Sequence, residues 1–563
     1  MAIYDLVIRG GTLADGTGGP LRSGDVGVRD GRIVAVGEVD GDATRTIDAD
    51  GALVAPGFVD IHTHYDGQAT WDSALAPSSW HGVTTVVAGN CGVGFAPVRP
   101  SDHQRLIELM EGVEDIPGAA LHEGLSWDWQ TFGEYMDAVE RVPHDIDIGL
   151  QLPHGALRLH VMGERGADRE PATGDDIAEM AEIARQAVLD GALGFTTSRT
   201  MNHRTSTGDY TPTLTAEADE LVGIASGLGA AGRGVLQVVS DYRDVDAEFA
   251  IFRRMAEESG RPLSTSLAQS SMAPSMYRRV LELLAEANAD GVPMRAQVAA
   301  RAVGILLGLQ CTWNPFLRNP VYQEIAGLPV AERAQAMGDP AFKARLLEVD
   351  RPHPSYGEMF ELGDPPDYEP DPSSSIAARA ARDGRQANEY AYEIIRRDEG
   401  RAFLYQPFLN WADGNLDAVG EMLADPNAVP GLSDGGAHVG TICDGSFPTT
   451  LLTLWGRDRD RGQLGLPLLV ARQCRDTAAT VGLHDRGVLA PGYRADINVI
   501  DHERLTMRAP EMHFDLPAGG KRLLQRAEGY LHTIVAGEGV YEDGEATGAR
   551  PGRLVRGPQE ASR

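Results

Sequence analysis

The sequence predicts an α/β protein: a (β/α)8, TIM-like barrel with a small β-sandwich domain built from both chain termini. Three observations predict this architecture. Short apolar strands alternate with amphipathic helices through the middle of the 563-residue chain, and strands separated by Gly and Asp turns occupy both ends. In addition, the first strand is not followed by a GxGxxG motif, which would favour the alternative of an open doubly wound sheet. We therefore prefer the barrel.

The two ends of the chain share one pattern of short strands. An apolar hairpin surrounds the turn Asp30-Gly31, and the same texture returns near the C-terminus in ADINVID and LHTIVAGEGVYEDGEATG. A chain that leaves a small β domain, builds the main domain and then returns explains this pattern most simply. We expect residues 1–56 and 485–563 to form one split β-sandwich domain, and residues 57–484 to form the barrel.

The middle of the chain repeats a strand followed by a helix. Helices predicted at residues 175–190, 245–258 and 276–290 are each followed by a glycine or end close to one, and a strand comes almost at once, which is typical of parallel βα units. In such barrels the groups that carry out chemistry lie at the C-terminal ends of the strands. The eight predicted strands are residues 57–62, 83–88, 146–152, 192–197, 235–239, 262–268, 292–298 and 429–434.

Residues 309–400 do not fit this repeat. The segment is rich in Pro and charged residues and lies between the seventh and eighth predicted strands. Two interpretations stay open: an insertion that covers the barrel mouth as a lid, because long ordered loops are usually functional, or a surface elaboration with no catalytic part.

Composition argues against several classes of function. The formal net charge is −32, from 50 Lys and Arg against 82 Asp and Glu, which disfavours nucleic acid and anionic membranes as partners. We find no export signal and no membrane span. Four cysteines in so long a chain do not make a disulfide framework, so we expect a cytoplasmic protein. The composition leaves open whether the chain forms a homo-oligomer.

The first predicted barrel strand runs into a histidine pair, His62 and His64. Residues two apart in a strand point to the same face, so the two imidazoles can face one metal ion at the end of this strand. The pair follows an apolar strand that is entered through Ala55-Pro56-Gly57, directly after the β domain. This context favours metal ligation, which is a usual role of histidine.

The chain resembles the amidohydrolase superfamily, and within it the N-acyl-D-amino-acid deacylase (D-aminoacylase) branch. The segments that carry the resemblance are LVAPGFVDIHTHYD (53–66), GVTTVVAGNCGVGFAPV (82–98), LSDGGAH (432–438) and DRGVLAPGYRADINVID (485–501). The resemblance implies a metal-containing barrel with a sandwich built from both termini. It also implies a hydrolase that acts on carbon–nitrogen bonds other than peptide bonds.

The resemblance also implies roles for individual residues. Cys91, just past the second strand, corresponds to a zinc ligand; the alternative is a buried structural thiol. Asp434 corresponds to the aspartate that contacts the metal, takes a proton from metal-bound water and returns it to the departing amine; the alternative is a turn-capping loop aspartate. His438, four residues later, is a candidate for orienting Asp434 or the substrate.

The sequence also departs from that branch. D-aminoacylase-type sites take two more metal histidines from the ends of the fifth and sixth strands, where this chain has Ser240-Asp241 and Gln269-Ser270. A bridging lysine is also unavailable, because the only two lysines, Lys343 and Lys521, lie in the insertion and near the C-terminus. We therefore expect one Zn²⁺ per chain, or another divalent ion, held by His62, His64, Cys91 and Asp434. Asp241 and Gln269 can assist on geometry alone.

A substrate that carries a carboxylate needs a fixed cation in this acidic protein. Arg199 ranks first because it lies closest to the end of its strand, and His203 shares its loop. Arg204 and Arg301 are further candidates. For each of them the alternative is a loop ion pair or a solvated side chain.

The predicted function is hydrolysis of a linear amide in a small molecule, and N-acyl-D-amino acids are the first candidate substrates. By resemblance, a zinc-bound hydroxide attacks the carbonyl and Asp434 shuttles the proton. The alternatives are hydrolysis of a cyclic amide or imide of the hydantoin kind, or of another amide-like bond, and a catalytically lapsed barrel that binds a ligand.

Overall fold

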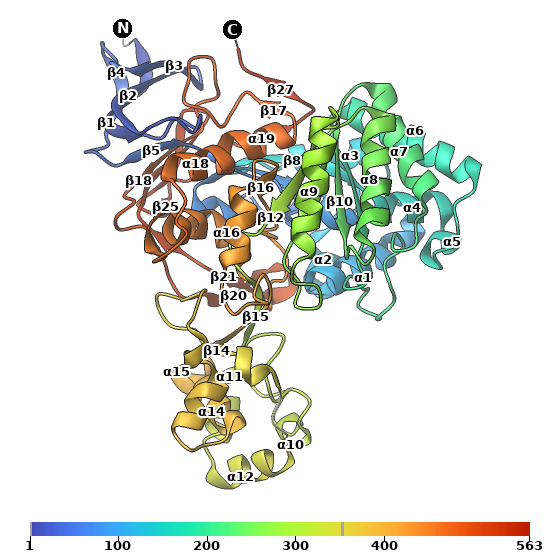
Figure 1. Cartoon of the computed structure of the whole chain (residues 1–563), viewed down its shortest axis with the longest axis vertical. Helices are drawn as coiled ribbons and strands as arrows, with labels where there is room; N and C mark the ends of the chain where they lie inside the picture. Colours follow the sequence, from blue (N-terminus) through green and yellow to red (C-terminus); the bar gives the residue numbers. More distant parts are fainter. Residues whose placement is uncertain (1–2, 351–353, 563) are drawn as a thin grey trace.

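A nearly closed parallel barrel forms the centre of the computed structural model, which describes residues 3–350 and 354–562 (Figure 1). Its strands are hydrogen-bonded in the order β16-β12-β11-β10-β9-β8-β7-β6. An isolated parallel bridge between Thr63 and Gly435 brings the two end strands together. The predicted barrel is confirmed. The strands are β6 (Phe58–Asp60), β7 (Val83–Ala88), β8 (Asp147–Pro153), β9 (Gly194–Arg199), β10 (Val235–Ser240), β11 (Leu263–Leu267), β12 (Met294–Val298) and β16 (Ala428–Pro430).

The first and last barrel strands are shorter than the sequence predicts. β6 ends at Asp60, so His62 and His64 lie beyond the strand and are held by the bridge at Thr63. β16 ends at Pro430 instead of continuing to residue 434, because Leu432 and Asp434 have left-handed backbone angles (φ 58° and 48°) that cannot continue a ladder. Both ends therefore become irregular where the candidate ligands begin.

Helices cover the outside of the barrel, as Figure 1 shows for the helices between β8 and β12. The predicted helices appear as α6 (Gly174–Asp190), α8 (Val245–Ser259) and α9 (Met276–Ala289), with α7 (Ala218–Ala231) between the first two. In α6 the capping box of Thr173 and Asp176 begins the helix, and Gly191 ends it with φ 119°. These caps place the following strand against the sheet.

Strands from both termini form one nine-stranded mixed sheet, which confirms that the two ends build a common β domain. The junction is the antiparallel pairing of β5 with β18, in which Val54 lies opposite Val499. Apolar residues from both ends share the core of this domain, among them Ile8 and Ile534. The strands are β1 (Tyr4–Leu13), β2 (Arg22–Arg29), β3 (Arg32–Gly37), β4 (Ala43–Asp48), β5 (Leu53–Pro56), β18 (Ile497–Ile500), β23 (Tyr530–Val535), β24 (Glu538–Glu542) and β25 (Glu545–Ala546).

The insertion forms a lobe that projects from the barrel (Figure 1) and has its own apolar core. Its base is the antiparallel pair β13 (Val303–Leu307) and β15 (Leu404–Leu409). Close to the base, the Thr312 backbone N–H donates to the Gly440 carbonyl (2.9 Å). The base therefore contacts the loop that follows β16, and the lid function stays a prediction. The lobe's helices are α10 (Pro320–Gln323), α11 (Val330–Ala336), α12 (Pro340–Val349), α13 (Ile376–Arg382), α14 (Ala387–Ile395) and α15 (Arg397–Gly400).

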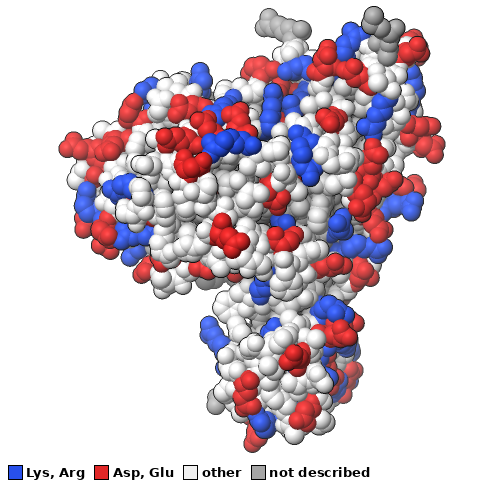
Figure 2. Space-filling view, turned by 180° about the vertical axis from the view of Figure 1, so that it is seen from behind, with Lys and Arg blue, Asp and Glu red and all other residues white. Residues whose placement is uncertain are grey.

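Acidic and basic side chains are interspersed over the face seen in Figure 2, in keeping with exposed arginine–carboxylate pairs such as Arg254–Glu258 (2.6 Å). Within the described residues, the helices are all too short or too polar to span a bilayer.

Candidate metal centre

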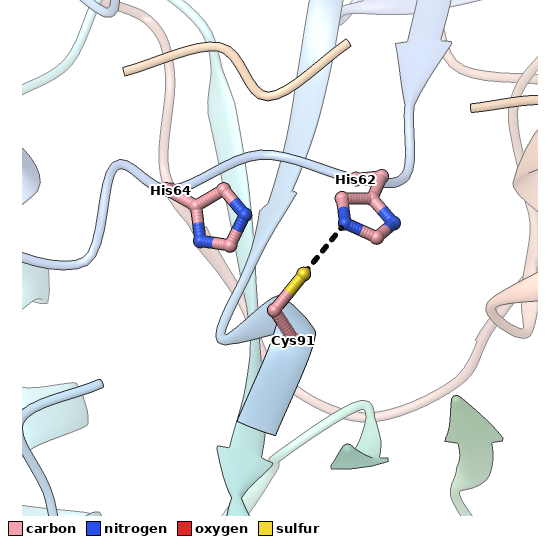
Figure 3. A group of neighbouring side chains, drawn as sticks. All are labelled: His62, His64 and Cys91. Carbon is pink, nitrogen blue, oxygen red and sulfur yellow. Dashed lines mark hydrogen bonds between the residues drawn. The ribbon is translucent and has the colours of Figure 1, made fainter. Parts of the chain in front are cut away.

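His62, His64 and Cys91 lie together at the barrel mouth, with one potential ligand atom from each within 4.8 Å of the others (Figure 3). His62 Nε2 is 3.3 Å from Cys91 Sγ. All three side chains are buried. The structure thus brings together two imidazoles from the end of β6 and a thiol from the end of β7.

The Gly89-Asn90-Cys91 loop follows β7 in a conformation that aims the thiol at the histidines. Gly89 has φ 87°, and a Cβ there would lie 2.1 Å from the carbonyl oxygen of Gln151 on β8, so only glycine fits. Asn90 Nδ2 donates to the carbonyls of Thr63 (3.2 Å) and Val87 (2.8 Å). Cys91 itself has φ 55°, which costs backbone strain of the kind that clusters at functional sites.

Asp434 enters the same group from the loop after β16. Its Oδ1 is 3.4 Å from His62 Nε2 and 3.6 Å from His64 Nε2. The Asp434 N–H donates to the His62 carbonyl (3.1 Å), and the His64 N–H donates to the Gly435 carbonyl (2.8 Å). The Asp434 side chain is 19% exposed against 1% for His62, so solvent reaches the group from the Asp434 side.

Gln297 on β12 fixes the orientation of His62. Its Oε1 lies 2.7 Å from His62 Nδ1. Because Gln297 Nε2 donates to Ser264 (2.9 Å), Oε1 is the acceptor and Nδ1 carries the proton, which leaves the lone pair of Nε2 facing Cys91 and Asp434. Sequence reasoning missed Gln297. Its signal was a polar residue near the C-terminal end of a strand predicted to be buried.

Glu114, the last residue of α1 (His103–Glu114), is a second residue that sequence reasoning missed. Its Oε1 is 3.5 Å from His64 Nδ1, and its Oε2 is 3.4 Å from His438 Nε2. The side chain is buried. We find no sequence signal for it, because it reaches the site from the far end of a helix.

Burial and neighbouring charges shift the pKa values of these groups. Burial lowers the pKa of His62 to about 4 and raises the pKa of the Cys91 thiol to about 12. Burial alone would lower the pKa of His64, but Glu114 and Asp434 raise it well above its usual value. Burial alone would raise the pKa of Asp434, but the surrounding imidazoles hold it well below its usual range.

These side chains suit a metal ion. In the described part of the chain, His64 Nε2 and Asp434 Oδ1, which lie 3.6 Å apart, are both buried without a hydrogen-bond partner. Each such atom costs about 1–3 kcal/mol unless something binds it. Nitrogen, sulfur and carboxylate donors are the combination that Zn²⁺ accepts. His62, His64, Cys91 and Asp434 are therefore the candidate ligands of one ion.

Comparison with known proteins agrees with this fold. A family model described as "Amidohydrolase family" matches residues 45–353 and 370–541. The chain belongs to the amidohydrolase family. A D-aminoacylase from Alcaligenes xylosoxydans xylosoxydans is 27% identical to it, over 98% of this chain and 97% of the relative.

Two solved structures superimpose on nearly the whole of this amidohydrolase. One is a D-aminoacylase, described in terms of a binuclear metal centre with one-metal activation and second-metal attenuation (TM-score 0.66, 25% identity, 98% of this chain and 100% of that chain). The other is N-acyl-D-glutamate deacylase from Bordetella bronchiseptica, complexed with zinc and a phosphonate inhibitor (TM-score 0.65, 25% identity, 98% and 99%). The resemblance to the N-acyl-D-amino-acid deacylase branch is confirmed, and the protein is a hydrolase of carbon–nitrogen bonds other than peptide bonds.

Two of the three predicted substrate residues of this amidohydrolase lie near the ligand group. His438 Nε2 is 3.9 Å from Asp434 Oδ2, and its side chain is 25% exposed. His203 is anchored by Ser198 Oγ (2.9 Å from Nδ1), and desolvation followed by the charges of His438 and His64 lowers its pKa to about 3. His203 is therefore a neutral imidazole beside the site.

The other residues predicted to bind metal or substrate make contacts with neighbouring residues of the chain instead. Arg199 makes a bidentate pair with Glu248 (both distances 2.9 Å), so its charge is already compensated. Asp241 accepts from the Met201 N–H (2.9 Å). Gln269 donates to Asp413 (2.7 Å). The positions where the related branch has two further histidines thus belong to loop contacts in this chain. Arg301 likewise pairs with Asp444 (2.9 Å), and Arg204 stacks on the ring of Tyr210.

Proposed function

We propose that this amidohydrolase is a metal-dependent deacylase of N-acyl-amino acids, with N-acyl-D-amino acids as its first substrate class. One observation carries the proposal: buried, unpartnered N and O atoms gather beside a thiol at the mouth of the barrel. Similar proteins are named D-aminoacylase, N-acyl-D-aspartate deacylase and N-acyl-D-glutamate deacylase, and these names support the substrate class.

In this proposal His62, His64, Cys91 and Asp434 hold one divalent ion. When bound, Zn²⁺ would polarise the scissile carbonyl and lower the pKa of a water molecule. The imidazoles around Asp434 keep its carboxylate ionised, so it can accept the proton of the attacking water. Asp434 then delivers that proton to the amine nitrogen as the carbon–nitrogen bond breaks and the new carbon–oxygen bond remains in the acid product.

A single ion per chain is the proposed stoichiometry. Asp241 and Gln269 occupy the positions from which a second ion would need ligands, and both side chains form hydrogen bonds with neighbouring loops. Cys91 is buried between His62 and His64, which places the sulfur within a single ligand group.

All four cysteines are free thiols, which supports a reducing compartment such as the cytoplasm.

Metal content tests the proposal first. We would measure bound metal by elemental analysis in freshly purified wild type, His62→Ala and the control His484→Ala, which removes an exposed histidine from β17 (Leu483–His484). We expect about one zinc per chain in wild type and the control, and loss of that zinc in His62→Ala. Wild-type protein without bound metal, and without activity after addition of Zn²⁺, Mn²⁺ or Co²⁺, would refute the proposal.

Activity then tests the substrate class. N-acyl-amino acids of both chiralities and a hydantoin would be screened with wild type and with Asp434→Asn. We expect turnover of an N-acyl-D-amino acid that Asp434→Asn abolishes. Turnover of the hydantoin alone would move the assignment to cyclic amides. A protein that holds zinc but hydrolyses none of these compounds would favour a ligand-binding barrel.

A further inference from the structure

Glu114 is a buried carboxylate whose two oxygens face two different histidines of the site. Its Oε1 lies 3.5 Å from His64 Nδ1, and its Oε2 lies 3.4 Å from His438 Nε2. The side chain is 1% exposed. Among the described side chains, the ion pairs of Glu114 are with these two imidazoles, and Oε1 has no hydrogen-bond partner. Burying a carboxylate costs free energy unless it is paired with a partner, and the two imidazoles are the partners available here.

The position of Glu114 determines which nitrogen of His64 faces the candidate ligand group. A carboxylate beside Nδ1 favours the proton on Nδ1, because an ionised carboxylate can only accept. Nε2 is then the nitrogen on the side of Asp434, whose Oδ1 is 3.6 Å away, and it is the nitrogen available to a metal ion. At His62 the corresponding contact is the 2.7 Å hydrogen bond from Nδ1 to Gln297, and both histidines present Nε2 to Asp434 Oδ1.

Glu114 is also tied to the loop that carries Asp434. The backbone N–H of His438 donates to the Glu114 carbonyl, in addition to the side-chain contact. The next residue, Asp115, leaves the helix with φ 50° and accepts from the hydroxyl of Thr441 (3.2 Å). The end of α1 therefore contacts both the β6 ligand and the β16 loop.

We propose that Glu114 is a positioning residue of the metal centre, which holds His64 with Nε2 toward the ion and fixes His438 beside Asp434. The inference rests on the proposed metal site. Carboxylates that accept the second N–H of a ligating histidine orient the ring and raise its basicity, and removing them typically weakens metal binding about 10–100-fold. Glu114 is expected to act in this way without touching the substrate.

The test measures metal binding by Glu114→Gln, which keeps the shape of the side chain but removes its charge. The matched control is Glu108→Gln, on the same helix, whose carboxylate accepts from the exposed Gln104 (2.8 Å). Zn²⁺ affinity would be measured by chelator competition, and the ligand field by the absorption spectrum of the Co²⁺-loaded protein. We expect Zn²⁺ binding to be about 10–100-fold weaker in Glu114→Gln, with shifted Co²⁺ bands, and unchanged in the control.

A purely structural role for Glu114 would give a different result. The melting temperature of metal-free Glu114→Gln would then fall, while the Zn²⁺ affinity and Co²⁺ spectrum of the folded protein would match wild type, and the inference would be overturned. Glu114→Asp, which keeps the charge but retracts it, gives the same comparison if Glu114→Gln does not fold. Wild-type protein that binds neither ion would refute the proposed function, and this inference with it.

Discussion

Replacing Gln297 by leucine should weaken metal binding without disturbing the ligands themselves. Gln297 Oε1 is the acceptor for His62 Nδ1–H at 2.7 Å, and both side chains are buried at the mouth of the barrel. Leucine has a similar size but no acceptor, so the buried N–H loses its partner, which costs about 1–3 kcal/mol. An independent estimate agrees: loss of such a partner weakens metal binding about 10–100-fold, which corresponds to about 1.4–2.8 kcal/mol. We therefore expect the Zn²⁺ dissociation constant to rise at least about tenfold.

Gln237→Leu is the matched control for this prediction. Gln237 is also a buried glutamine on a barrel strand, β10, but its Nε2 donates only weakly to Ser266 Oγ (3.5 Å), and its Oε1 is unpartnered. The assay is chelator competition for Zn²⁺ at constant pH, with circular dichroism to verify folding. Equal loss of affinity in both variants, or none in Gln297→Leu, would show that the contact does not orient His62.

Three further predictions concern other parts of the molecule. Gly89→Ala should abolish metal binding, because the added Cβ would collide with the backbone of β8. Gly232→Ala is the control: this glycine also has a positive φ, but an added Cβ would meet nothing within 4 Å, so the substitution should only lower stability by about 1–2 kcal/mol. Zn²⁺ titration and thermal melts test both variants. Zn²⁺ affinity should rise with pH between 6 and 8, because burial raises the pKa of the Cys91 thiol to about 12 and this thiol must lose its proton in order to bind the ion as a thiolate. An affinity that falls as pH rises would contradict this. Arg486→Met removes the buried ion pair with Asp147 and should destabilise the fold by about 3–5 kcal/mol. Arg254→Met removes only exposed ion pairs, with Asp219 and Glu258, each of which contributes about 0–1 kcal/mol. Comparable denaturation midpoints for the two variants would refute that difference.

The barrel could be predicted from sequence because its strands are continuous apolar runs between glycine-ended helices. β7, predicted at residues 83–88, has those bounds in the structure. The ends of β6 and β16 were harder, because left-handed backbone at Leu432 and Asp434 depends on contacts with the neighbouring strand end. Such contacts link residues that are hundreds of positions apart.

In the candidate site, too, the sequence reveals some residues and not others. His62 and Cys91 directly follow strands, so their position along the chain already indicates the barrel mouth. Glu114 reaches the mouth from the end of a helix, and no spacing rule connects it with His64. Arg199 is the last residue of β9, but its partner Glu248 comes from the next βα unit, and the sequence does not reveal that this cation is already paired.

The pairing of β5 with β18 has a consequence for how the protein is made. The N-terminal strands leave the ribosome first, but β5 gains its antiparallel neighbour only when β18, near the C-terminus, has been synthesised. At about 5–20 residues per second, this delay is on the order of 20–90 s. During that time the nascent chain exposes an unpaired strand edge while the barrel is still being translated. The β domain is thus completed only late in synthesis, and chaperones that shield the emerging N-terminus should raise the yield of native enzyme.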